Sequence, residues 1–376
     1  VTVEARDGDG VWRRYAPFVI RVSEDEIDPY MVYRLIEPGY ETWGEMGIYQ
    51  RCLETFREEP VIETSSAGYG CINCHTFRSQ DPDMMLFHMR QTHAGTMLLR
   101  EGRIERLNTA TDSTISSTVY PSWHPSGRYI AFSVNATKLI TLPDESNRVE
   151  VFDSASDVVV YDTERHELYS VPELMRGDRF ETFPSFSPAG DKLYFCTADS
   201  VEMPARYKEA RYSLCSIGFD AASGRLGRDV DTLCNARTTG RSVSFPRVSP
   251  DGAFMLYALS DYGTFSIWHR DADLRMIDLR SGREVETSAV NSPEAESYHS
   301  WSSNSRWILF NSRRVDGLYT HVYMAHVSDD GTLSKPFLLP QQNPEHNTWR
   351  LKSYNTPQFI RGEVRLPEKE LKNLFK

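Results

Sequence analysis

Phe183-Pro-Ser-Phe-Ser-Pro-Ala-Gly-Asp-Lys-Leu-Tyr-Phe195 is the stretch that decides the fold of this chain. Apolar residues flank a Ser-Pro-Ala-Gly turn, which predicts two antiparallel strands because Pro presets φ and Gly tolerates positive φ. The pattern returns at 120–132, 245–257 and 298–310, with the same nine-residue step from the central apolar residue to the closing aromatic residue. The chain is therefore built from similar β-units.

Further strands are expected after each of these stretches. These strands are predicted at 157–161 and 167–171, and the equivalent strands of other units at 214–219, 276–279 and 321–327. One unit is thus about four antiparallel strands. A repeated four-stranded sheet is the signature of a β-propeller, because a lone sheet cannot bury both of its faces whereas stacked sheets can.

Two weaker copies bring the number of units to six. Residues 354–360 read as a first strand near the C-terminus, and 74–77 with 84–87 read as the start of another unit. Strands at 95–100 and 103–107 complete that second copy. We predict an all-β, six-bladed propeller of four-stranded antiparallel blades over residues 70–376.

Residues 1–69 are predicted to form an N-terminal extension. Strands at 18–22 and 31–36 would complete the last blade, which starts at the C-terminus and would otherwise keep a free edge. Ile48, Tyr49, Cys52 and Phe56 recur at roughly helical spacing, which predicts one amphipathic helix over Thr42–Arg57.

Cys71-Ile72-Asn73-Cys74-His75 is the attachment signature of c-type haem. In such a site the thiols of Cys71 and Cys74 add to the porphyrin vinyl groups, and His75 becomes one axial iron ligand. A redox disulfide or half of a zinc site stays possible. A zinc site would need a second ligand pair, and a thioredoxin-like motif would need a βαβ context; the sequence shows neither.

A sixth iron ligand should be His or Met, as in electron-transfer haems. His88 is the first candidate, because a histidine is unusual in an otherwise apolar strand. Core packing is the better interpretation of each nearby methionine. His124 is expected at the surface of a turn. The other candidate ligands are Met84, Met85, Met89, His93 and His299.

The remaining polar and thiol groups give weaker predictions. Cys52 should be a buried thiol within the predicted helix, and Cys196 could form a disulfide with Cys215 across a hairpin. The dense polar group 313–316 is expected either to lock blades together through salt bridges or to line the channel mouth.

The composition limits the partners. The chain has 376 residues and a net charge of −11, so nucleic acid and anionic membrane surfaces are poor partners. No stretch approaches the roughly 20 apolar residues of a transmembrane helix. The chain starts at Val1 and shows no signal peptide, so we expect a trimmed sequence whose export signal was lost. A lipid anchor lost with it would not be visible, and we expect a monomer.

The repeat Pro-x-Phe-Ser-Pro-x-Gly-x-x-Leu-x-Phe resembles the TolB-type, WD-like propeller repeat. Together with Cys-x-Asn-Cys-His it resembles a group of exported Bacteroidetes proteins in which such a propeller carries a cytochrome c motif. Residues 311–320 and 335–340 fit that group, and the resemblance covers roughly 60–376. It implies covalent haem c and a periplasmic or cell-envelope location.

Three functions are compatible with these observations. The first is an exported monohaem c-type cytochrome that exchanges single electrons with a protein partner. The second is an interaction or scaffold propeller whose CxxCH is structural. The third is an enzyme acting at the channel mouth, although no G-x-S-x-G, H-E-x-x-H, Walker or Rossmann string is present.

Overall fold

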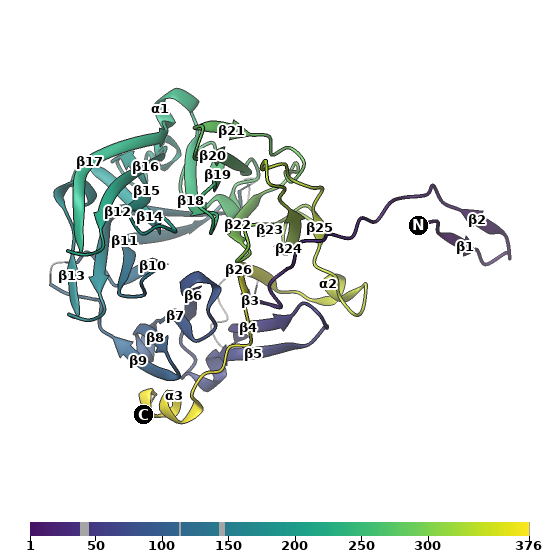
Figure 1. Ribbon diagram of the computed structural model, residues 1–376, viewed down its shortest axis with the longest axis horizontal. Helices are drawn as coiled ribbons and strands as arrows, with labels where there is room; N and C mark the ends of the chain where they lie inside the picture. The colour runs from purple at the N-terminus through teal and green to yellow at the C-terminus, as the bar shows by residue number, and fades with distance from the viewer. Residues whose placement is uncertain (38–44, 113, 143–146, 376) are drawn as a thin grey trace.

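The computed structural model describes residues 1–37, 45–112, 114–142 and 147–375. These residues form six four-stranded sheets and one two-stranded sheet, in which every pairing is antiparallel. The four-stranded sheets surround a common centre (Figure 1). The predicted all-β fold of four-stranded antiparallel sheets is confirmed.

Five of the four-stranded sheets follow one another along the chain, and their strands lie in sequence order. The first two consist of β6 (Ile72–Phe77), β7 (Met84–Met89), β8 (Gly95–Arg100) and β9 (Arg103–Leu107), then β10 (Thr118–Trp123), β11 (Tyr129–Thr141), β12 (Val149–Asp162) and β13 (Glu167–Tyr169). The third consists of β14 (Arg179–Phe186), β15 (Lys192–Asp199), β16 (Ser213–Asp220) and β17 (Arg225–Cys234).

The fourth sheet consists of β18 (Ser242–Val248), β19 (Phe254–Ser260), β20 (Asp273–Asp278) and β21 (Arg283–Val285). The fifth consists of β22 (Glu296–Trp301), β23 (Trp307–Ser312), β24 (His321–His326) and β25 (Phe337–Leu338). Three short helices are described, α1 (Ala236–Thr239), α2 (His346–Trp349) and α3 (Glu368–Leu374). None of the described helices is long and apolar enough to span a membrane.

The sixth sheet joins the two ends of the chain. C-terminal β26 (Ser353–Ile360) pairs with β3 (Tyr30–Ile36), followed by β4 (Gly47–Cys52) and β5 (Glu58–Glu63). First strands of successive sheets contact one another all the way round, from β6 through β10, β14, β18 and β22 to β26 and back to β6. Closure by N-terminal strands is therefore confirmed for residues 31–36.

Two predictions for the N-terminal region are wrong. Residues 18–22 form no strand and are exposed, and they belong to an arm with β1 (Glu4–Arg6) and β2 (Trp12–Arg14) that extends away from the ring (Figure 1). The segment predicted as a helix over Thr42–Arg57 contains β4 instead. Residues 42–44 of that segment lie outside the described residues. Because β4 lies between two sheets, Ile48 packs on one neighbour and Tyr49 on the other, which hid the period of two.

The core is divided among the interfaces between neighbouring sheets. Each of the six large clusters of buried apolar side chains draws all or nearly all of its members from two adjacent sheets, and together the clusters complete the circle. Burial of the two faces of every sheet explains why the strands read as nearly continuous apolar runs. It also ties the stability of each sheet to both of its neighbours.

The first strand of every four-stranded sheet has a β-bulge at an equivalent position. The bulged residue has φ between +45° and +53° in all six copies, although none is glycine. Positive φ is unfavourable for a residue with a Cβ, so this conformation persists only where contacts with the surrounding structure stabilise it. The six bulged residues are Cys74, Tyr120, Phe183, Phe245, Tyr298 and Thr356.

Candidate haem-attachment site

The CxxCH segment lies at the start of β6, as predicted, and its last two residues fall in the bulge. Four of the other bulged residues are aromatic, and their rings meet in the middle of the ring of sheets. Ring centroids are 4.7 Å apart for Tyr120 and Phe183, 4.1 Å for Phe183 and Phe245, and 5.0 Å for Phe245 and Tyr298. Cys74 thus takes the position of a central aromatic residue.

Both motif thiols are free. Cys71 is buried beside Ile36 and Met46, its backbone N–H donates to Oε1 of Gln91 at 2.8 Å, and its sulfur accepts from Nδ2 of Asn73 at 3.4 Å. Burial raises the pKa of Cys74. The Cys74 sulfur is therefore a protonated thiol at neutral pH in this environment.

His75 is buried, and neither of its ring nitrogens has a hydrogen-bond partner among the described residues. Backbone groups of Val32 and Thr356, in the sheet that contains β26 and β3, lie close enough to the ring to act on its pKa, although neither contact has the geometry of a hydrogen bond. Burial, assisted by Arg34, lowers the pKa of His75 to about 3. The imidazole is therefore neutral at pH 7, which is the form that ligates metals.

The structure does not bring His75 and His88 together. Nδ1 of His88 is 2.8 Å from Oγ1 of Thr96, and its ring centroid is 5.9 Å from that of Phe132 in β11. His88 therefore faces the sheet formed by β10–β13, whereas His75 faces the sheet that contains β26. The sheet β6–β9 lies between the two imidazoles.

The other candidate ligands are dispersed. Met85 and Met89 pack in the cluster on the His75 side of the sheet, whereas Met84 packs on the opposite side. His93 lies against Phe375 with ring centroids 5.0 Å apart, and Nε2 of His299 donates to the carbonyl of Leu256 at 3.0 Å. In the part of the chain that the structure describes, no three His, Cys, Asp or Glu side chains converge as a metal site.

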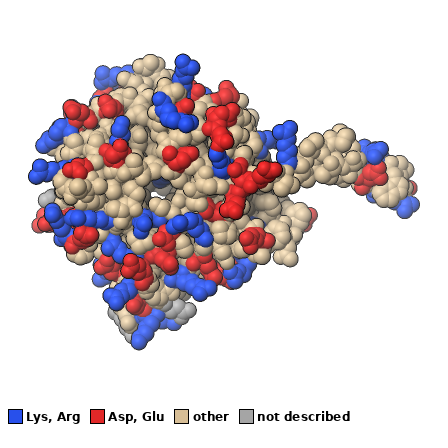
Figure 2. Space-filling model, in the orientation of Figure 1, with Lys and Arg blue, Asp and Glu red and all other residues tan. Residues whose placement is uncertain are grey.

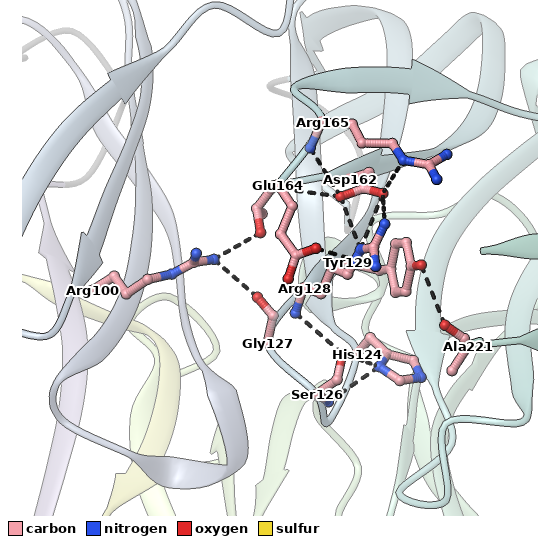
Figure 3. Close-up of polar contacts among 11 residues, drawn as sticks. Arg100, His124, Ser126, Gly127, Arg128, Tyr129, Asp162, Glu164, Arg165 and Ala221 are labelled. Atoms are coloured by element: carbon pink, nitrogen blue, oxygen red, sulfur yellow. Dashed lines mark hydrogen bonds and ion pairs between the residues drawn. The ribbon is translucent and has the colours of Figure 1, made fainter. Parts of the chain in front are cut away.

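The expectation that His124 is a surface residue is wrong. His124 is buried, and Nε2 donates to the carbonyl of Gly190 in the neighbouring sheet at 3.0 Å. Figure 3 shows its ring beside Ser126 and near Tyr129, below the bidentate contact of Arg128 with Asp162. The turn is covered because stacking of the sheets places the next sheet against it.

The two other cysteine predictions have mixed outcomes. Cys196 and Cys215 form no disulfide, because Cys196 pairs with Leu214 across the strands and Cys215 is offset by one residue, so the two side chains face opposite sides of the sheet. Cys52 is buried, as predicted, but at the end of β4 rather than in a helix.

The polar group 313–316 divides into separate contacts. Nη2 of Arg314 is 3.0 Å from Oε1 of the buried Glu296 in the same sheet. Arg313 lies 4.0 Å above the ring of Trp268, which precedes β20 in the neighbouring sheet. Asp316 accepts from the backbone N–H groups of Leu318 and Tyr319 in its own turn. Arg313 is the member that reaches between sheets.

Comparisons with solved structures agree on the fold. TolB from Acinetobacter baumannii matches with a TM-score of 0.54 and 13% identity, over 88% of this chain and 66% of that one. Hydrazine synthase from Kuenenia stuttgartiensis matches with a TM-score of 0.53 and 11% identity, over 91% of this chain and 48% of that one.

A hypothetical selenium-binding protein from Sulfolobus tokodaii matches with a TM-score of 0.51 and 7% identity, over 91% of this chain and 96% of that one. No family model matches the sequence, and no curated protein matches it. These likenesses show a TolB-like β-propeller fold.

Proposed function

We propose that this chain is a six-bladed propeller, one blade per four-stranded sheet, that carries haem c on Cys71 and Cys74 and exchanges single electrons with a protein partner. His75 would be the axial ligand of the iron. The observation that carries the proposal is a buried, neutral imidazole with two unpartnered nitrogens, directly after two free thiols at attachment spacing.

The donor chemistry of these residues fits haem c. A buried polar atom without a partner costs about 1–3 kcal/mol, so a ligand that uses a nitrogen of His75 is favoured. Haem supplies a one-electron iron couple when it is bound. The residues of the chain contribute two attachment thiols and one neutral imidazole, and Arg34 beside His75 disfavours protonation of the ring.

Among the sixth-ligand candidates, Met85 and Met89 suit the proposal better than His88. Both methionines belong to the cluster on the His75 side of the sheet, and His88 belongs to the opposite side. The bulged residues of the two sheets that meet at His75 are Cys74 and Thr356. Both are smaller than the aromatic residues at the same position in the other four sheets.

Covalent attachment of haem c takes place outside the cytoplasm, so the proposal includes export to the periplasm or cell envelope. The resemblance to exported Bacteroidetes propellers with the same Cys-x-Asn-Cys-His string supports that location. A redox protein is the partner that such a location and cofactor require.

The test is production with an export signal and c-type maturation machinery, followed by mass spectrometry of the Cys71–His75 peptide. We expect a haem adduct on wild type and on Cys196→Ser, which removes a buried thiol elsewhere, and none on the double variant Cys71→Ser/Cys74→Ser. His75→Ala should keep the adduct but change the absorption spectrum, because one axial ligand is lost. Absence of an adduct from exported, matured wild type would refute the proposal.

A specific observation also favours a scaffold function. The residue after the bulge is His75 in β6 and His299 in β22, and His299 makes a purely structural contact with Leu256. Under this alternative the matured protein carries no haem, and His75→Ala lowers the melting temperature about as much as His299→Ala.

A further inference from the structure

One side-chain position recurs around the channel, two residues after each bulged residue. Five of its six occupants are uncharged polar residues, and the sixth is an arginine. Because each follows the same bulge in a first strand, they hold equivalent places around the centre. The set is Thr76, Ser122, Ser185, Arg247, Ser300 and Gln358.

These residues border a cavity in the channel. All of these residues except Ser185 line a space of about 140 Å³, together with Trp123 and Trp301. This volume exceeds the roughly 30 Å³ that one water molecule occupies in the liquid. Thr76 and Gln358 make no side-chain hydrogen bond among the described residues, so their polar groups remain available to a ligand.

Arg247 is the charged group of this cavity, and no carboxylate pairs with it among the described residues. Nη1 donates to the carbonyl of Pro246 at 2.9 Å, and the neighbouring His299 is neutral because burial lowers its pKa to about 3. Burial also lowers the pKa of Arg247 to about 10, which leaves the guanidinium charged at pH 7. Arg247 is half-buried, and a charge held partly out of water without a counter-charge is costly.

We propose that the channel cavity binds a small oxyanion, of the size of phosphate or a short carboxylate, against Arg247. The planar fork of a guanidinium matches two oxygens of such an anion. The hydroxyl of Thr76 in β6 and the amide of Gln358 in β26 supply further donors. In the circle of first strands β6 lies opposite β18, and β26 is next to β6. The cavity adjoins the CxxCH motif, since Thr76 directly follows His75, but no residue of the motif lines it and the proposed binding does not depend on haem.

The test is isothermal titration and thermal unfolding of the whole chain in a low-salt buffer free of phosphate, carboxylate and sulfate. Inorganic phosphate and acetate are the two probes, and their order of affinity identifies the oxyanion class. We expect saturable binding of one anion per chain and a melting temperature that rises with anion concentration, because only the folded state binds.

Arg247→Gln should lower the affinity at least tenfold, because it removes the charge and keeps an amide donor. Arg225→Gln removes the same charge from an exposed position of β17 and should bind as wild type does. Arg247→Lys keeps the charge without the fork and should bind with intermediate affinity, which covers the case that Arg247→Gln fails to fold. No saturable binding of either probe to wild type, or equal binding by the Arg247 variants, would overturn the proposal.

Discussion

Glu181 is a fully buried carboxyl group in β14, and burial raises its pKa from the ordinary value of 4.5 to about 8. Between these two values the unfolded chain ionises while the folded chain keeps Glu181 protonated. The folded state therefore binds more protons, and the free energy of unfolding falls as pH rises from about 4.5 to 8.

Glu181→Gln should remove this slope. The variant should exceed wild type in free energy of unfolding at pH 8 by about 1–3 kcal/mol, less than the full shift implies because relaxation and water entry reduce burial penalties. Urea unfolding at pH 5, 6, 7 and 8 measures the effect. Glu167→Gln, at an exposed position of β13, is the matched control and should follow wild type. Parallel pH profiles for Glu181→Gln and wild type would show that Glu181 is ionised when folded.

At the scale of elements, the turn after each first strand depends on what stacks against it. Gly190 and Gly252 hold equivalent turn positions with φ of +76° and +74°. A Cβ on Gly190 would lie 2.3 Å from Nε2 of His124, whereas a Cβ on Gly252 would have no heavy atom within 4 Å. Equal backbone conformations therefore meet different surroundings.

We expect Gly252→Ala to cost about 1–2 kcal/mol of unfolding free energy, the cost of positive φ for a residue with a Cβ. Gly190→Ala should cost about 1–3 kcal/mol more, because the new methyl group displaces His124. Chemical denaturation of both variants measures the difference. Equal losses of unfolding free energy in the two variants would mean that His124 moves away from residue 190 at no cost.

At the scale of the whole molecule, the ring is closed by β3 and not by the N-terminal arm. Removal of residues 1–22 deletes exposed chain and should leave the melting temperature within about 1 °C of wild type, because little buried surface is lost. Removal of residues 1–37 deletes β3, separates β26 from β4 and exposes strand edges, so aggregation is expected.

Size-exclusion chromatography and thermal unfolding of the two truncations provide the measurement. A shorter chain lacking 1–37 that stays monomeric and as stable as wild type would contradict closure through β3. Charge should not drive this aggregation, because acidic and basic side chains are interspersed over the face shown in Figure 2.

The sequence by itself determined the repeated unit and the place of the CxxCH motif at the start of a first strand. Both follow from local chemistry, because Pro-x-Gly turns, short apolar runs and a nine-residue step are properties of residues that are close together in the sequence. The repeat also distinguishes Arg247, because the other copies have Ser, Thr or Gln at the same position.

Only the tertiary structure decided which residues meet. Ile48 and Tyr49 of β4 face two different neighbouring sheets, so their pattern imitated a helix, and the burial of His124 depends on Gly190 in another sheet. The separation of His75 from His88 by a sheet is likewise a property of stacking. Contacts between sheets join residues far apart in the chain, and no local pattern records which face a neighbour covers.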